Sequence, residues 1–211
     1  MRPGYIILIP QRCPVLKMVT TLKYSSTNTY FVKENGSGLL VDTGYAGSLP
    51  LFFKELKTAG ISIKDIDYCF ATHYHPDHIG LIGELQELGV KLIIADVQLP
   101  FVHFADRIFA RDGFKNYKAP DESAATVISI EQSRQLLASL GISGELVHTP
   151  SHSADCVSLA LGSGECIVGD LEPLSYLKAY ENNQALKADW ARILEFKPKR
   201  ILYAHANEGH L

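Results

Sequence analysis

The chemistry of this chain is concentrated in residues 73–78, which read His-Tyr-His-Pro-Asp-His. Imidazole nitrogens and carboxylate oxygens are side-chain atoms that bind divalent transition metals. Four ligating groups so close together cost free energy unless a cation compensates them. We therefore expect a bound metal ion at this turn. A solvated, histidine-rich loop is the alternative.

The spacing within this turn predicts two ions. His73 and His75 are two residues apart directly after a predicted strand, and alternate residues of an extended chain point to the same side. Pro76 favours a change of direction, which would turn Asp77 and His78 toward a second ion. A helical site of the HExxH type is not indicated, because the chain contains no such motif.

A two-ion site needs more ligands than one turn supplies. Three further candidates each follow a predicted strand or loop: His152 in Thr-Pro-Ser-His, Asp170 in Val-Gly-Asp and His205 in Tyr-Ala-His. Strand ends are rigid places from which to hang ligands.

Three other histidines stand outside this set. His148 lies four residues before His152 and could compete with it, but its place at a strand end favours a structural role. His103 lies in a mostly apolar stretch and is expected to pack rather than to ligate. His210 would become a ligand only if His205 is not one.

The elements that must position these residues change character along the chain. Up to about residue 40 the pattern favours strands, at Tyr5–Ile9, Lys17–Leu22, Thr29–Val32 and Leu39–Val41. Asn35-Gly36 predicts a hairpin between the last two. Further strands are predicted at Tyr68–Ala71, Lys91–Ala95, within Asp121–Ile130, and at Glu145–His148, Val157–Leu161, Glu165–Val168 and Arg200–Tyr203. Helices are predicted at Leu49–Thr58, Leu81–Leu88, Glu131–Leu140 and Tyr176–Phe196. Strands first and alternation later favour layered sheets with helices outside.

Size and composition are compatible with one domain over residues 1–211. The chain has 211 residues, 46% of them hydrophobic, and no linker-like or low-complexity stretch. Twenty lysine and arginine residues against 23 aspartate and glutamate residues form no basic stripe. Nucleic acid is therefore not an evident partner, and a small-molecule substrate is expected. The oligomeric state stays open.

No segment of the sequence indicates a membrane or an export signal. The apolar run Tyr5–Ile9 stops at Pro10 and is too short for a signal peptide, and no run approaches transmembrane length. The four cysteines form no CxxC pair and are expected to be buried free thiols. These features predict a cytoplasmic protein.

Five ordered elements resemble the motifs of the metallo-β-lactamase-fold hydrolases over nearly the whole chain. They are Val41-Asp42-Thr43-Gly44, Thr72–His78, Thr149–His152, Gly169-Asp170 and His205. The resemblance implies an α+β fold, a four-layer αβ/βα sandwich with the metals at one edge between two sheets. Two departures are Ser151, where the family usually has glycine, and Ala206 after the last histidine.

The resemblance also implies roles for the ligand candidates. The first metal would be bound by His73, His75 and His152, and the second by Asp77, His78 and His205. Asp170 would bridge the two. Asp42 would orient the site through hydrogen bonds, and an Asx-turn residue before Gly44 is the alternative.

Two ions about 3.5 Å apart can share a hydroxide, which is a ready nucleophile at neutral pH. Asp77 could then accept its proton. We expect a dinuclear hydrolase of a small ester, thioester or lactone, with zinc the first choice of metal and iron or manganese open. The alternative is an iron-dependent oxygenase similar to the persulfide dioxygenases, or a metal-binding sensor. Residues 100–119, rich in aromatic residues and interspersed cations, would either cover the site or pack as an amphipathic helix.

Overall fold

The computed structural model describes residues 18–114, 116–179 and 182–210, which form two β-sheets with helices outside them. One sheet has six strands in sequence order: β1 (Val19–Lys23), β2 (Asn28–Val32), β3 (Leu39–Val41), β4 (Tyr68–Phe70), β5 (Lys91–Ala95) and β6 (Thr126–Ile128). The other has five, in the order β11 (Gly209–His210), β10 (Arg200–Tyr203), β9 (Glu165–Gly169), β8 (Val157–Leu161) and β7 (Gly144–His148).

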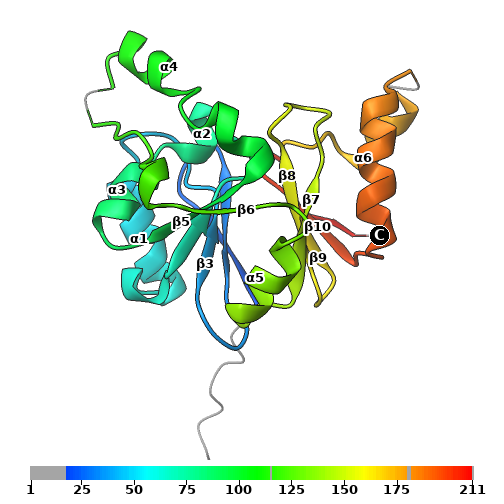
Figure 1. The fold of residues 1–211 in the computed structure, drawn as a ribbon, viewed down its shortest axis with the longest axis horizontal. Helices are drawn as coiled ribbons and strands as arrows, with labels where there is room; N and C mark the ends of the chain where they lie inside the picture. The colour runs from blue at the N-terminus through cyan, green and yellow to red at the C-terminus, as the bar shows by residue number, and fades with distance from the viewer. Residues whose placement is uncertain (1–17, 115, 180–181, 211) are drawn as a thin grey trace, which may run out of the picture.

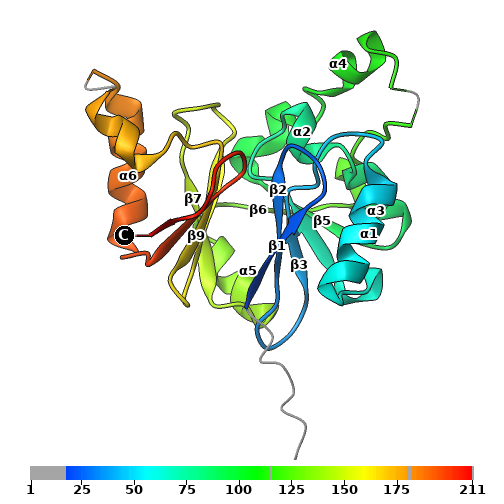
Figure 2. The same ribbon diagram turned by 180° about the vertical axis from the view of Figure 1, so that it is seen from behind.

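The helices lie on the outer faces of the two sheets and at the ends of the sandwich (Figure 1). They are α1 (Leu49–Ala59), α2 (Pro76–Ile79), α3 (Ile82–Glu87), α4 (Asp106–Arg111), α5 (Ser133–Ser139) and α6 (Gln184–Glu195), with 3-10 turns at Ile63–Asp65, Asp96–Phe101, Glu122–Ala124 and Leu174–Lys178. Helices α1 and α3 flank the six-stranded sheet, and α6 flanks the five-stranded sheet (Figures 1 and 2). Helix α4 projects beyond the layers at the end of the molecule where α2 lies (Figure 1).

Three apolar clusters separate these layers. Leu40 of β3 lies in one cluster with Phe52 of α1, whereas its neighbour Leu39 lies in another with Ile167 of the other sheet. This follows from the alternation of side chains along a strand. Trp190 of α6 lies in a third cluster, on the outer face of the five-stranded sheet. The αβ/βα sandwich predicted from the sequence is confirmed.

Most predicted strands are present within a residue or two of their expected bounds. The hairpin at Asn35-Gly36 is confirmed, because β2 and β3 pair antiparallel across it, and β8 and β9 form the expected second hairpin. The strand predicted at Tyr5–Ile9 lies outside the described residues. Cys69, Cys156 and Cys166 are buried free thiols as expected, and Cys13 also lies outside that range.

The prediction of one long helix over Tyr176–Phe196 is wrong. A 3-10 turn covers Leu174–Lys178, and α6 begins only at Gln184. The Asn183 side chain accepts a hydrogen bond of 2.9 Å from the backbone N–H of Leu186, which caps a new helix start. Strand β10 is also not the last strand, because β11 follows and pairs antiparallel with it. No helix in the described part of the chain is long and apolar enough to span a membrane.

The strand directions bring the candidate ligands to one edge of the sandwich. Strands β3 and β4 run parallel, as do β9 and β10, so the segments that follow them leave the sheets at their carboxyl ends. Asp42, the 73–78 turn, Asp170 and His205 all follow these strands directly or within three residues. The loop carrying His152 follows β7, which pairs antiparallel with β8.

Candidate metal centre

The 73–78 turn changes direction at Pro76. His75 is held in an extended conformation (φ −74°, ψ 153°), as expected for a residue before proline, and Pro76 is the first residue of α2. His73 Nε2 lies 3.0 Å from His75 Nδ1, so the two rings face one point as their spacing predicts. Asp77 and His78 lie beyond the bend, in the short helix α2 that the sequence did not predict.

One group of potential ligands combines both sheets. It contains His73, His75, His152 and Asp170, whose ligand atoms all lie within 4.8 Å of one another. His152 Nε2 lies 3.2 Å from His75 Nδ1. We call this the first group. Its members are the three histidines expected at the first metal together with the expected bridging carboxylate.

A second group contains Asp77, His78 and His205, again within 4.8 Å of one another. His205 Nε2 lies 3.0 Å from Asp77 Oδ2, and His78 Nε2 lies 3.7 Å from the same oxygen. These three residues are the ones expected at the second metal.

Asp170 lies between the two groups. Its Oδ2 is 3.5 Å from His152 Nε2 and 3.8 Å from His73 Nε2. Its Oδ1 is 3.3 Å from the Nε2 atoms of both His78 and His205. Each carboxylate oxygen therefore faces a different group, which is the placement that a bridging ligand requires.

Gly169 allows Asp170 to reach this position. Its φ is +56°, in the left-handed region that favours glycine, and an added Cβ would lie 2.6 Å from Thr72 Oγ1. A side chain at this position would push apart the two loops that carry the ligands.

The chemistry of the two groups fits divalent metal ions. His78 Nε2 and Asp170 Oδ1 are both buried and make no hydrogen bond within the described residues. The two atoms face each other as an ion pair at 3.3 Å, but buried polar atoms that lack hydrogen bonds are costly, and a cation bound by both atoms would satisfy them. Imidazole nitrogens with carboxylate oxygens suit zinc and also iron.

Asp42 connects the second group to the six-stranded sheet. It adopts a φ of +62°, which Asp tolerates better than most residues, and its side chain is buried. Its carboxylate accepts a 2.7 Å hydrogen bond from the Thr72 N–H and lies 3.0 Å from His78 Nδ1. These contacts hold the His78 ring against the six-stranded sheet and differ from those of an Asx turn, whose partners are local.

Burial and neighbouring charges shift the pKa values of His73 and His78 in opposite directions. Burial lowers the pKa of His73 far below its usual range, and the adjacent histidines add to this shift. Burial also opposes the charged form of His78, but the Asp42 and Asp170 carboxylates outweigh it and raise the pKa of His78 to about 10. Burial would raise the pKa of Asp170, yet His78 and the other nearby histidines lower it overall.

The first group is supported mainly through the backbone of its loops. Asp155 is buried and accepts a 2.7 Å hydrogen bond from the Tyr74 N–H, which joins the His152 loop to the 73–78 turn. Gln98 donates to the carbonyls of Ala71 (2.8 Å) and Asp155 (3.2 Å).

The other side of the His152 loop is fixed as well. The Ser151 N–H donates to the buried carboxylate of Asp189 in α6 at 2.7 Å. His148 Nε2 lies 2.8 Å from the Ala154 carbonyl. His148 therefore has the structural role expected of it and belongs to neither group.

The second group is supported by the turn between β1 and β2. Thr27 Oγ1 donates to Asp77 Oδ2 at 3.2 Å, and the Ser26 carbonyl lies 3.1 Å from His205 Nδ1. Sequence reasoning missed this turn, as it missed Asp155 and Gln98. No local signal marks such residues, because the partners are far away along the chain.

The two remaining histidines lie away from the centre. His103 was expected to pack, but its side chain is 49% exposed and pairs with Asp106 at 2.8 Å, so this prediction is wrong. The helical turns around it direct it outward rather than into the core. His210, in β11, lies 3.4 Å from Glu208.

Residues 100–119 were expected either to cover the site or to pack against the sandwich, and they do part of each. Phe109 is fully buried and stacks on Tyr117 with a centroid distance of 4.1 Å, which anchors the segment to the sandwich. Phe104 is half exposed, and its ring lies 5.5 Å from that of His75. One side of this segment therefore packs, while Phe104 flanks the centre. Lys115, one of the cations that the sequence intersperses among these aromatic residues, lies outside the described residues.

An open cavity adjoins the centre. It has a volume of about 300 Å³ and is lined by His152, Asp170, His205, Glu172, Tyr176 and Tyr203, so it offers space for a small molecule beside the ligand groups. A separate cavity of about 550 Å³ is lined by residues of the 100–108 segment, Phe104 and His103 among them, and by no residue of either ligand group.

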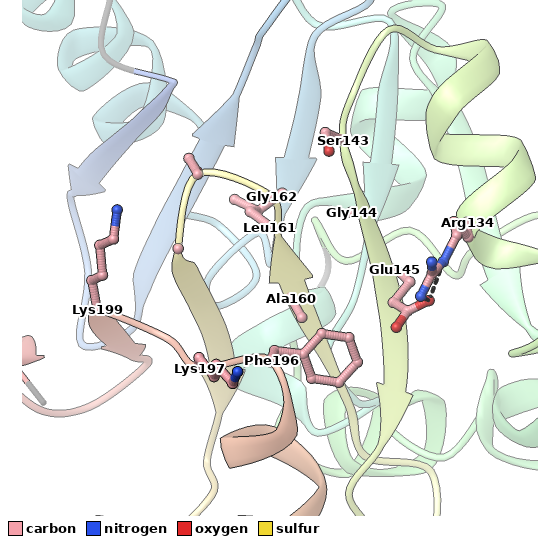
Figure 3. A pocket seen from close by; sticks show the side chains of 12 residues that line it. Arg134, Ser143, Gly144, Glu145, Ala160, Leu161, Gly162, Phe196, Lys197 and Lys199 are labelled. Carbon is pink, nitrogen blue, oxygen red and sulfur yellow. Dashed lines mark hydrogen bonds and ion pairs between the residues drawn. The ribbon is translucent and has the colours of Figure 1, made fainter.

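A cavity at the opposite end of the five-stranded sheet has a different character. It measures about 320 Å³ and lies among the first residues of β7, the turn between β8 and β9, and the residues after α6 (Figure 3). Arg134 donates to Glu145 there at 2.6 Å, and Lys197 and Lys199 also line it. It shares no residue with either ligand group.

Comparison with known proteins gives a consistent result. The sequence profile of the metallo-beta-lactamase superfamily matches residues 23–205. A beta-lactamase-like protein 2 homolog of Drosophila melanogaster is 29% identical over 203 residues, which cover 89% of this chain and 61% of that protein. A probable metallo-hydrolase of Methanocaldococcus jannaschii is 28% identical over 148 residues, covering 69% of this chain and 66% of that protein.

The fold also resembles those of solved structures. The crystal structure of TTHA1623 in a di-iron-bound form superposes with a TM-score of 0.67 at 23% identity, covering 91% of this chain and 93% of that chain. The likeness supports the architecture derived above from the layers and strand order.

Proposed function

Because the chain belongs to the metallo-beta-lactamase superfamily, we propose that it is a dinuclear metal-dependent hydrolase of a small ester, thioester or lactone. The observation that carries this proposal is the position of Asp170, with one carboxylate oxygen toward each of two ligand groups. Two groups joined by one carboxylate are the arrangement expected for a pair of ions rather than for one.

The proposed ligands are the residues of the two groups. His73, His75 and His152 would hold one ion, and Asp77, His78 and His205 the other, with Asp170 shared. Zinc is the proposed metal. Iron is a candidate because a protein of similar fold binds two irons, and manganese is one because it accepts carboxylate ligands. When bound, such a pair supplies a water with a pKa near 7 and polarises the scissile carbonyl.

The chain's own residues prepare the centre for this chemistry. Burial keeps His73 neutral, so its Nε2 lone pair is available without loss of a proton. Asp42 fixes the His78 ring through Nδ1 and leaves Nε2 directed toward the centre. Asp77 is partly exposed beside the same centre, and we propose that it accepts the proton of the attacking water.

A small substrate fits the surroundings better than a polymer. The cavity beside His152 and His205 has a volume of about 300 Å³, at the lower end of the range for small-molecule sites. Phe104 on the other side offers an apolar surface next to His75. A formal charge of −3 without a basic stripe gives no support to a nucleic-acid substrate.

The oxygenase alternative differs in the number of ions. A persulfide dioxygenase-like centre would use one iron, whereas the second group here offers three side chains of its own. That second group favours hydrolysis at two ions. The sensor alternative predicts metal binding without turnover.

Proton release at neutral pH from a panel of lactones, thioesters and phosphodiesters tests the proposal, with zinc-loaded protein as the catalyst. The His75→Ala variant serves as the blank, and His210→Ala, outside both groups, controls for loss of an arbitrary histidine. A signal on one bond class that is lost only in His75→Ala supports hydrolysis. Silence across the panel from protein that carries two ions would refute it and direct the search to oxygen uptake with persulfides.

A further inference from the structure

We propose that the 24–28 turn, which consists of the residues between β1 and β2 and the first residue of β2, makes the centre dinuclear by holding Asp77 and His205 in position for the second ion. This inference rests on the proposed metal centre and adds three positioning residues to it: Ser26, Thr27 and Asn28. None of the three is expected to touch a metal or the substrate. They act through the ligands that they hold.

Thr27 fixes the carboxylate of Asp77. Its side chain is fully buried, and its hydroxyl donates to Asp77 Oδ2, the oxygen that also faces His78 and His205. A buried hydroxyl has few alternative acceptors, so this hydrogen bond selects one rotation of the carboxylate. Without it, only the contacts with His205 and His78 would hold Asp77, whose side chain is 28% exposed and could turn toward solvent.

Ser26 and Asn28 fix His205. The Ser26 carbonyl lies 3.1 Å from His205 Nδ1 and so directs the other ring nitrogen, Nε2, toward the centre. Asn28 donates through its amide to the carbonyls of Tyr203 (2.9 Å) and Ala206 (3.1 Å), on either side of His205. The Asn28 backbone N–H donates to Ala204 at 2.8 Å. One asparagine thus holds the whole segment that carries the last ligand.

The turn itself is rigidly attached to the six-stranded sheet. Strands β1 and β2 pair in register from Val19 with Val32 to Lys23 with Asn28. The Thr29 hydroxyl adds a 3.2 Å hydrogen bond to the Leu22 carbonyl. The turn therefore presents Ser26, Thr27 and Asn28 at fixed positions to a segment of the other sheet.

The support is selective for the second group. Among the hydrogen bonds found in the described residues, those of the 24–28 turn reach Asp77 and the segment 203–206 but not His73, His75 or His152. The first group depends instead on Asp155, Gln98 and Asp189. Loss of the turn's hydrogen bonds should therefore convert a two-ion centre into a one-ion centre.

Stepwise titration of metal-depleted, full-length protein with Co²⁺, followed by absorption and calorimetry, tests this inference. Wild type should bind two ions. Thr27→Val keeps the shape of the side chain but removes the hydroxyl, and should weaken one binding step by about 10- to 100-fold while leaving the other unchanged. Thr27→Ser restores the hydroxyl and should restore the weakened step. Asn28→Ala should weaken the same step.

The control is Asn35→Ala, an exposed asparagine in the next turn of the same sheet, which should change neither step. Equal weakening of both steps in Thr27→Val, or no weakening, would overturn the inference, as would a wild type that binds one ion. Thermal unfolding of each metal-depleted variant distinguishes misfolding from selective loss of one metal-binding step. If Thr27→Val does not fold, the titration of Asn28→Ala tests the inference. Two-step binding without hydrolysis of any substrate would refute the proposed function and leave this inference standing.

Discussion

The two ligand groups of this protein are held in place by different means. The first group is fixed largely through backbone contacts between its loops, made by Asp155, Gln98 and Asp189. In the second group each ligand side chain has its own hydrogen-bonding partner outside the group: Thr27 for Asp77, Asp42 for His78 and Ser26 for His205. A site held through its backbone should fail together with its loops. A site held through its side chains can fail alone.

The groups also differ in charge before any metal binds. His73 is kept neutral by burial, whereas His78 is kept protonated by Asp42 and Asp170. An ion that enters the first group meets a free lone pair on His73. An ion that enters the second must displace a proton from His78. The difference suggests that the two ions bind with unequal affinity and unequal dependence on pH.

The largest effect should come from Asp170, the residue that the groups share. Asp170→Asn keeps the shape but removes the charge that faces both groups, so we expect both ions to bind weakly and turnover to fall by about three orders of magnitude or more. Metal analysis and a turnover assay measure this, with far-UV circular dichroism as the folding control. A variant that loses only one ion would show that Asp170 does not serve both groups.

Asp42→Asn should damage the second group more than the first, because Asp42 contacts His78 directly but reaches His73 only through Thr72. Asparagine tolerates the positive φ of +62° at this position, so the backbone is preserved. The hydrogen bond to His78 loses its charge, and we expect one binding step to weaken by about 10- to 100-fold. Co²⁺ titration gives the result. If Asp42→Asn instead weakened mainly the binding step that Thr27→Val leaves unchanged, Asp42 would support the first group and not the second.

Asp155→Ala should have the converse effect. It leaves the buried Tyr74 N–H without an acceptor, which costs about 1–3 kcal/mol of unfolding free energy. The loosened His152 loop should weaken the step that Asp42→Asn affects less, by about tenfold. Urea unfolding and the same titration measure the two effects. If the variant instead weakens the step that Asp42→Asn affects more, the division into two independently held groups is incorrect.

The smallest effect should be a difference in the number of protons that the two metal-binding steps release. With the pKa of His78 raised to about 10, this ring is protonated at pH 8 and must release its proton when an ion binds. One binding step should therefore release about one proton more than the other, and its affinity should rise more steeply with pH. Calorimetry in two buffers of different ionisation enthalpy counts these protons. Equal counts for both steps would contradict the charge difference.

How much the sequence predicts depends on how local each signal is. The 73–78 turn carries its ligands within six residues, and the ordered motifs add His152, Asp170 and His205, so the structure gathers the same residues that the sequence singled out. What these groups bind stays a prediction. Thr27 and Asp77 are 50 residues apart, and Asp155 and Tyr74 are 81 apart, so no local pattern marks these hydrogen bonds.

The errors in the predicted elements also arise from single side-chain contacts that the apolar pattern does not reveal. Apolar residues recur at helical spacing on both sides of Asn182-Asn183, and the pattern favours one continuous helix there. The Asn183 cap, which depends on a single side-chain hydrogen bond, decides that α6 starts afresh. His103 lies in an apolar run, yet the turn around it points its ring to solvent.

Each ligand group draws side chains from both sheets. His73 and His78 follow β4 of the six-stranded sheet, whereas Asp170 and His205 follow β9 and β10 of the five-stranded sheet. A bound ion would thus cross-link the two sheets and close a long loop of chain, much as a disulfide does. It would lower the entropy of the unfolded chain only if it stayed bound to that chain after unfolding. The end of the sandwich that carries the ligands would be clamped. The opposite end, with the cavity of Figure 3, would depend on apolar packing and on hydrogen bonds such as those from the backbone N–H groups of Asn35 and Ser37 to the carbonyls of Gly141 and Leu140. Metal loading should then convert a sandwich that opens at one edge into one that unfolds as a single cooperative unit.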